Sequence, residues 1–202
     1  IPVRGKHLDE LSSTDKLFVV LNKCSTCLFV YHCMRFAPHC STIKWTLEEA
    51  TVANTVGSLI AFYAFYDFFY MWFHWLLHNR SLYRYIHKHH HRQKAPSRGN
   101  VDAINVHPFE FITGEYLHLI TILVIPCHVS VATLFVLVGG LLASLNHTRF
   151  DVVIPFLENV PLYDVKVHDV HHRIPESNYA QYTMFWDRLF GFFRPYDAKV
   201  KN

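Results

Sequence analysis

Long apolar stretches, separated by short polar ones, run through most of this 202-residue chain. Residues 17–36 are mostly apolar and are followed by Pro38, which predicts a first membrane or interfacial helix. Residues 51–73 carry a single charged side chain, Asp67. At 1.5 Å per residue, a helix of this length covers roughly 35 Å, enough for the ~30 Å hydrocarbon core of a bilayer. We expect it to be the principal membrane span, with the helix starting at Thr46.

A third apolar stretch, residues 116–148, contains no Asp, Glu, Lys or Arg and is divided by Pro126. Two full spans of ~20 residues do not fit into it. The pattern predicts a helical hairpin that begins near Phe109 and whose first leg does not fully cross the membrane. Such a hairpin returns His147 to the side of His107 and of the basic residues 80–98, which the positive-inside rule assigns to the cytosol.

The chain after this hairpin is polar and aromatic, and prolines divide it into short helices. We therefore expect an N-terminal segment (1–50), a membrane domain (51–195) and a C-terminal tail (196–202). The predicted fold class is an all-α integral membrane protein.

The composition agrees with a membrane protein and narrows the chemistry. Hydrophobic residues make up 51% and charged residues 17%, whereas roughly 25% charged residues is typical of soluble proteins. A net charge of +3 is too small to indicate nucleic acid binding. The chain has no GxGxxG turn or phosphate-binding loop, so any electrons must come from a partner. Cys24 and Cys27 form a CxxC pair, but no second pair completes a zinc site, and we expect ordinary packing.

Histidine is far more frequent than usual, with 16 copies. Eight of them fall into three groups with offsets of three or four residues: His74 with His78; His87 with His90 and His91; and His168 with His171 and His172. These offsets place side chains on one face of a helix, so each group is expected to aim its imidazoles at a single point. Isolated histidines, such as His32 and His118, are expected to be ordinary hydrogen-bonded residues.

His107 and His147 complete a set of ten candidate metal ligands. Nine or ten imidazoles exceed the coordination of one ion and fit two metals with about four or five ligands each. Neutral imidazole suits Fe, Zn, Cu and Ni, so the ligand type does not name the metal. Haem is disfavoured because it requires single axial histidines. Soluble di-iron bundles use Glu ligands, which are missing from these groups.

These motifs resemble the fatty acid hydroxylase and sterol desaturase superfamily of integral-membrane oxygenases. Residues 74–78 match its HxxxH box, and residues 87–91 and 168–172 match its two HxxHH boxes. Residues 107–110 resemble the HPxE of the sterol methyl oxidase branch, and residues 178–191 are similar to the closing signature. The resemblance covers residues 51–194. Ala143 stands where some fatty-acyl members have a further histidine, which favours the sterol-oxidase-like branches.

The resemblance implies a cytosol-facing cap that holds two iron ions, with zinc as an alternative in the isolated protein. It implies O2-dependent hydroxylation or desaturation of a sterol or another long-chain lipid. It further implies electrons from NAD(P)H through a reductase and a b-type cytochrome, and the endoplasmic reticulum as the default membrane. Four carboxylates are candidates to orient imidazoles through their second nitrogen: Asp67, Glu110, Asp169 and Asp187. Asp67 shares a helical stripe with His74 and His78.

Two other functions are compatible with parts of the pattern. A structural subunit of a larger membrane complex could keep the fold without catalysis, but such a subunit would be expected to lose histidines. A zinc-dependent hydrolase would need a Glu general base beside an HExxH-type pair, and the sequence has none.

Overall fold

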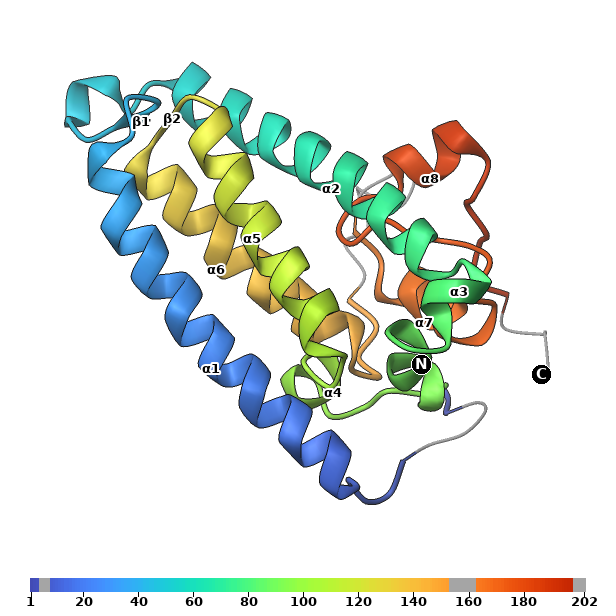
Figure 1. Cartoon of the computed structure of the whole chain (residues 1–202). Coiled ribbons are helices and arrows are strands. Elements are labelled where there is room, and N and C mark those ends of the chain that lie inside the picture. Colours follow the sequence, from blue (N-terminus) through green and yellow to red (C-terminus); the bar gives the residue numbers. More distant parts are fainter. Residues whose placement is uncertain (4–7, 153–162, 198–202) are drawn as a thin grey trace.

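The computed structural model describes residues 1–3, 8–152 and 163–197. Most of them are helical, which confirms the all-α fold class. Figure 1 shows the long helices packed along one another, with the short helices gathered at one end as a cap. The long helices are α1 (Ser13–Phe36), α2 (Ser58–Leu77), α5 (Pro108–Val124) and α6 (Val129–Asn146). The cap contains α3 (Arg80–Tyr83), the 3-10 helix η4 (His87–Arg92), α4 (Asn100–Ala103), α7 (Val165–Arg173) and α8 (Phe185–Phe190).

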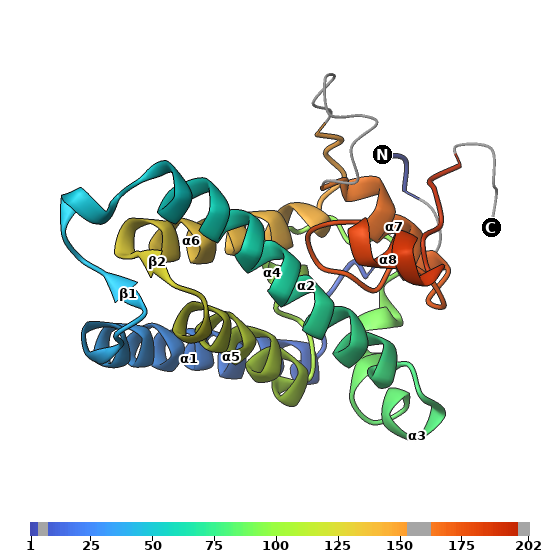
Figure 2. The same cartoon turned by 90° about the horizontal axis from the view of Figure 1, so that it is seen from above.

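The long helices form two layers. Seen from above, α1 and α5 lie together in one layer, and α2 and α6 lie in the other (Figure 2). At the end opposite the cap, the two-residue strand β1 (Ile43–Lys44) pairs in parallel with β2 (Cys127–His128), just after α5. This pairing ties the connection between α1 and α2 to the turn of the α5–α6 hairpin.

Within the part of the chain that the structure describes, three helical stretches are long and apolar enough to cross a membrane: Ser13–His39, Ala53–Leu77 and Val129–Asn146. Helix α5 has 17 residues, so it rises only about 26 Å and falls short of a ~30 Å hydrocarbon core. The short first leg expected for the hairpin is therefore present.

The entry into α2 differs from the expected helix start at Thr46. A 3-10 turn occupies Leu47–Glu49 and a π-helical turn occupies Ala53–Gly57, so the regular helix begins at Ser58. The Thr46 side chain does not cap a backbone N–H, because its hydroxyl donates to the Glu49 carboxylate at 3.3 Å. The acidic residues thus belong to a local turn and not to the first turn of a long helix.

The core where α2, α5 and α6 meet is rich in aromatic residues. Phe62 and Tyr66 of α2 pack against Phe135 of α6, and the rings of Phe62 and Phe135 are 4.8 Å apart. Helix α1 also carries a polar contact toward the cap: the Asn22 side-chain amide donates to the carbonyls of Ile104 and Val106 at 2.8 and 3.0 Å. These bonds hold the segment between α4 and α5 against α1.

Candidate metal centre

Nine of the ten candidate ligands converge inside the cap in two neighbouring groups. Within each group the ligand nitrogens all lie within 4.8 Å of one another. The first group contains His74, His78, His87, His91 and His171, and the second contains His90, His147, His168 and His172. The groups adjoin, since the rings of His91 and His172 are 5.2 Å apart. The geometry thus offers two metal positions with five and four imidazoles.

Each HxxHH box divides its histidines between the two groups. In residues 87–91 the first and last histidines belong to the first group, and His90 belongs to the second. In residues 168–172 the first and last belong to the second group, and His171 belongs to the first. The expectation that each box aims at a single point was wrong. In the α-helix α7 the reason is angular, because residues four apart share a face more closely than residues three apart. Residues 87–92 form a 3-10 helix, whose spacing brings residues three apart together and does not account for the same division there.

Backbone carbonyls fix the orientation of four of these rings through their Nδ1 atoms. Nδ1 of His74 lies 2.8 Å from the Tyr179 carbonyl, and Nδ1 of His171 lies 2.7 Å from the Ser177 carbonyl. In the second group, the carbonyls of Ala143 and Gln93 hold Nδ1 of His147 and His172 at 2.9 and 3.0 Å. A carbonyl can only accept, so each Nδ1 carries the proton and each Nε2 presents a lone pair.

These lone pairs face one another across the two positions. Nε2 of His74 is 3.0 Å from Nε2 of His87, and Nε2 of His147 is 3.2 Å from Nε2 of His168. The buried Nε2 of His78 has no hydrogen-bond partner within the described residues. Lone pairs at such separations repel each other unless a cation lies between them, so this donor set fits a metal ion at each position.

Burial keeps these imidazoles neutral, the form that binds metal. Burial, and then the charge of the neighbouring His87, lowers the pKa of His78 to about 3. Burial and then the neighbouring imidazoles hold the pKa of five others well below the usual range: His90, His91, His168, His171 and His172. Burial also lowers the pKa of His147.

Only one of the four candidate carboxylates contacts a ligand imidazole in the described residues. The Glu110 carboxylate lies 2.8 Å from Nδ1 of His87, and both side chains are buried. Asp67 is fully buried, but it accepts hydrogen bonds from the backbone N–H groups of Gln181, Tyr182 and Thr183. Among the contacts of the described residues, Asp67 therefore has polar backbone partners in place of an imidazole, because residues 181–183 cover that face of α2.

Asp187 and Asp169 also act away from the imidazoles. Asp187 accepts from the backbone N–H groups of Tyr179 and Ala180 at 2.8 and 3.0 Å, and burial raises its pKa to about 6. Together Asp67 and Asp187 hold the loop whose Tyr179 carbonyl orients His74. Asp169 pairs with Arg149 and Arg173, which joins the end of α6 to α7.

His107 lies outside both groups. Its Nδ1 accepts from the Phe109 backbone N–H at 3.2 Å and caps the start of α5. The sequence pattern did not single out two further carboxylates that support the cap, Asp102 and Asp15. Asp102 accepts from the backbone N–H groups of Ser97 and Arg98, and Asp15 pairs with Arg92 at 3.2 Å. Asp15 lies in the first turn of α1 and forms a capping box with Ser12, a pattern that marks a helix start and not a contact with the cap. Asp102 had no distinctive sequence signal.

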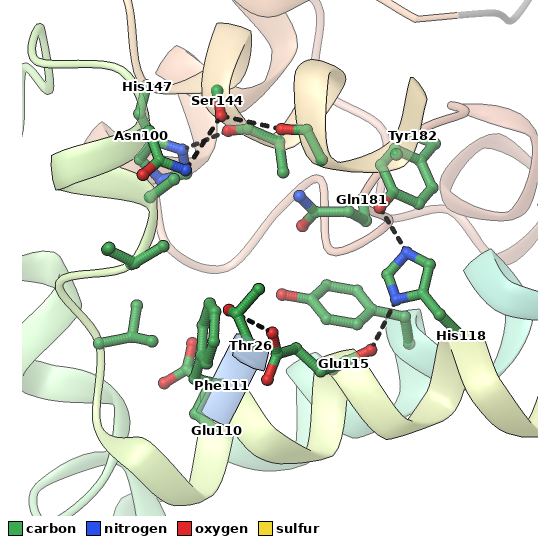
Figure 3. Close-up of a pocket in the computed structure, with 18 of the residues that line it drawn as sticks. Thr26, Asn100, Glu110, Phe111, Glu115, His118, Ser144, His147, Gln181 and Tyr182 are labelled. Atoms are coloured by element: carbon green, nitrogen blue, oxygen red, sulfur yellow. Dashed lines mark hydrogen bonds between the residues drawn. The ribbon is translucent and has the colours of Figure 1, made fainter. Parts of the chain in front are cut away.

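A cavity of about 370 Å³ leads from these histidines into the space between the two helix layers (Figure 3). His74, His87, His90, His147 and His168 line one part of it. Along α5 the lining runs from Glu110 to His118, which is about 12 Å of helix. Much of the remaining wall is apolar, with Phe29, Val30, Ile104, Val136 and Leu137 among its residues.

Comparison with known proteins places these features in a family. A profile described as fatty acid hydroxylase matches residues 59–192. The chain is 32% identical over 133 residues to methylsterol monooxygenase 1 of Rattus norvegicus, covering 64% of this chain and 45% of that protein. It is 34% identical over 138 residues to lathosterol oxidase of the same organism, covering 68% and 45%. It is 27% identical over 132 residues to a delta(7)-sterol-C5(6)-desaturase of Nicotiana tabacum, covering 64% and 47%.

The chain thus spans less than half the length of these relatives. No solved structure matches it significantly. The family profile covers α2, all nine converging histidines and the loop that orients His74. From this match, the chain belongs to the fatty acid hydroxylase family.

Proposed function

We propose that the protein is an O2-dependent, non-haem di-iron oxidoreductase that hydroxylates or desaturates a sterol or another long-chain lipid. The observation that carries this proposal is the connection between two all-histidine groups and an apolar cavity between membrane-type helices. The names of the relatives, a sterol monooxygenase and a sterol desaturase among them, support a sterol-like substrate.

The cavity suits a lipid that arrives from the bilayer. Val30 of α1 and Leu137 of α6 line the cavity and are also exposed, at 46% and 66%. They mark a rim between α1 and α6 through which an apolar molecule can enter from the side. The lining in the described residues includes no Lys or Arg, so a neutral lipid is preferred over an anionic one.

The chain's own residues position the reaction. The first group of histidines would hold one iron and the second group the other, and the bound metals supply the reduction of O2 and the oxidation of a C–H bond. Glu110 fixes the ring of His87 beside the cavity, and Asp67 and Asp187 hold the loop that fixes His74. Apolar walls keep bulk water away from the lipid carbon next to the histidines.

Electrons would come from NAD(P)H through a reductase and a b-type cytochrome. The basic residues between α2 and α4, with Arg84 and Lys88 among them, give the cap a surface suited to an acidic electron carrier on the cytosolic side. We place the protein in the endoplasmic reticulum membrane, the default for this family.

The test is turnover by the purified full chain in lipid nanodiscs. The chain is loaded with Fe²⁺ and supplied with NADPH, a cytochrome reductase and a b-type cytochrome. We expect O2-dependent oxidation of a methylated sterol, detected by mass spectrometry, and its loss in His168→Ala. A protein that holds two metals but oxidises no sterol or long-chain lipid, while it co-purifies in a stable membrane complex, would support the structural subunit instead.

A further inference from the structure

Two polar side chains in the cavity wall have no hydrogen-bond partner among the described residues: the Gln181 carboxamide and the Tyr70 hydroxyl. Other polar groups of the wall are paired. The Glu115 carboxylate accepts from Thr26 at 2.6 Å, and the His118 ring lies 2.8 Å from the Tyr182 hydroxyl. An unpaired amide in an apolar cavity is costly, so a ligand that completes its hydrogen bonds gains affinity.

The backbone of Gln181 is held by two helices that also position ligand histidines, α2 and α6. Its N–H donates to Asp67 on α2 at 3.2 Å, and its carbonyl accepts from Asn146, the neighbour of His147, at 3.0 Å. Figure 3 shows its carboxamide pointing into the cavity, away from Tyr182. The position of this amide is therefore set by contacts that its own side chain does not make.

Tyr70 lines the same cavity from α2. It follows Asp67 by three residues on α2, so the two share a helix face, and its ring centroid is 5.6 Å from that of His74. The ring packs closely against α5: a Cβ added at Gly114 would be in ordinary van der Waals contact with a Tyr70 ring carbon, at 3.5 Å. The phenol is thus fixed close to the first metal position.

We propose that Gln181 and Tyr70 bind the hydroxyl group of a neutral lipid alcohol and hold it next to the carbon that is oxidised. This inference rests on the proposed function, since it assigns the substrate class of the same site. An alcohol both donates and accepts, as do a carboxamide and a phenol, so the two groups complement it. A carboxylate is disfavoured because Glu110 and Glu115 line the cavity and no cation does in the described residues.

The test is equilibrium binding to the metal-loaded full chain in nanodiscs, without reductant. The probes are a radiolabelled 4-methyl-3β-hydroxysterol, its 3-O-methyl ether and palmitate. We expect the alcohol to bind at least ~10-fold more tightly than the ether or palmitate. Gln181→Leu should weaken binding of the alcohol about 10-fold, to the level of the ether, and leave the ether unchanged. Tyr70→Phe, which removes only the hydroxyl, should act in the same direction.

Leu141→Ala is the matched control, because Leu141 lies on α6 but faces outward at 57% exposure. It should bind all three probes as the parent does. Metal content of every variant reports whether the cap has formed. The inference is overturned if the parent binds ether or palmitate as tightly as alcohol, or if Gln181→Leu weakens alcohol and ether equally. Since no turnover is measured, a selective chain that oxidises nothing would refute the proposed function and leave this inference standing.

Discussion

At the scale of single residues, the arrangement depends on which atom each histidine presents. The Nδ1 atoms of His74, His147, His171 and His172 donate to backbone carbonyls, which leaves their Nε2 lone pairs directed inward. Each histidine belongs to one group only, so the loss of one histidine removes a ligand from that group and leaves the other group complete. This division makes the two metal positions separable by mutation.

We predict that His90→Ala and His171→Ala each lower metal content from two ions per chain to about one, at different positions. His90 belongs to the second group, which falls to three imidazoles, and His171 belongs to the first. Metal analysis of the purified variants checks this, and the double variant should hold neither ion firmly. If either single variant released both ions, the two groups would form one inseparable site.

A second prediction concerns Asp67, which accepts three backbone N–H groups from residues 181–183. Asp67→Asn replaces one acceptor oxygen with a donor, so at least one buried N–H loses its partner at a cost of about 1–3 kcal/mol. The loop that orients His74 loosens, and metal affinity of the first group should fall roughly 10-fold. Thermal unfolding and metal titration measure both effects. The exposed Glu48→Gln should change neither, and a parent-like Asp67→Asn would show that the loop is held by other contacts.

At the scale of helices, periodicity and length predicted much of the fold. Residues 17–36 fall within α1, and all but the first two residues of 51–73 lie in the stretch Ala53–Leu77. Pro126 correctly marks the turn of the hairpin. The 3-10 form of η4 and the partners of Asp67 could not be predicted. They depend on tertiary contacts with backbone groups, and a backbone carbonyl such as that of Tyr179 leaves no signature in the sequence.

Two adjacent glycines on α6 give a test of the cavity at this scale. A Cβ at Gly140 would meet nothing within 4 Å, whereas a Cβ at Gly139 would lie 2.8 Å from the Tyr182 hydroxyl. Gly140 lines the cavity, so the leucine side chain of Gly140→Leu should fill part of the volume that the lipid occupies, without a backbone clash. We expect it to weaken sterol binding at least ~10-fold. Its stability should rise by up to about 1 kcal/mol, since leucine favours the helix over glycine.

Gly139→Leu is the contrasting variant. It must displace the paired Tyr182 and His118 and should cost about 1–3 kcal/mol of stability. Thermal unfolding and sterol binding of both variants are the measurements. Unchanged sterol binding in Gly140→Leu would mean that the lipid occupies a different space.

At the scale of the whole molecule, the metal positions join segments that are far apart in the chain. The first group takes ligands from the end of α2, from η4 and from α7, and the second takes them from η4, from α7 and from His147 after α6. The membrane helices have their own aromatic core, with Phe62, Tyr66 and Phe135 at its centre. The cap has many buried polar groups and few large apolar ones, so metal cross-links should carry much of its stability.

We therefore predict that chelation opens the cap and leaves the membrane helices folded. Without metal, the Nε2 lone pairs of His91 in η4 and His171 in α7, only 3.1 Å apart, repel each other, and the simplest relief is separation of η4 from α7. Hydrogen exchange should rise about 10-fold or more in residues 87–92 and 165–173, while α6 keeps its protection. Re-addition of Fe²⁺ or Zn²⁺ should restore protection in the parent but only partly in His171→Ala. Equal protection of the cap before and after complete metal removal would contradict this prediction. It would show that hydrogen bonds to groups such as Asp102 and Asp187 hold the cap without metal, and that the metals bind to a preformed site.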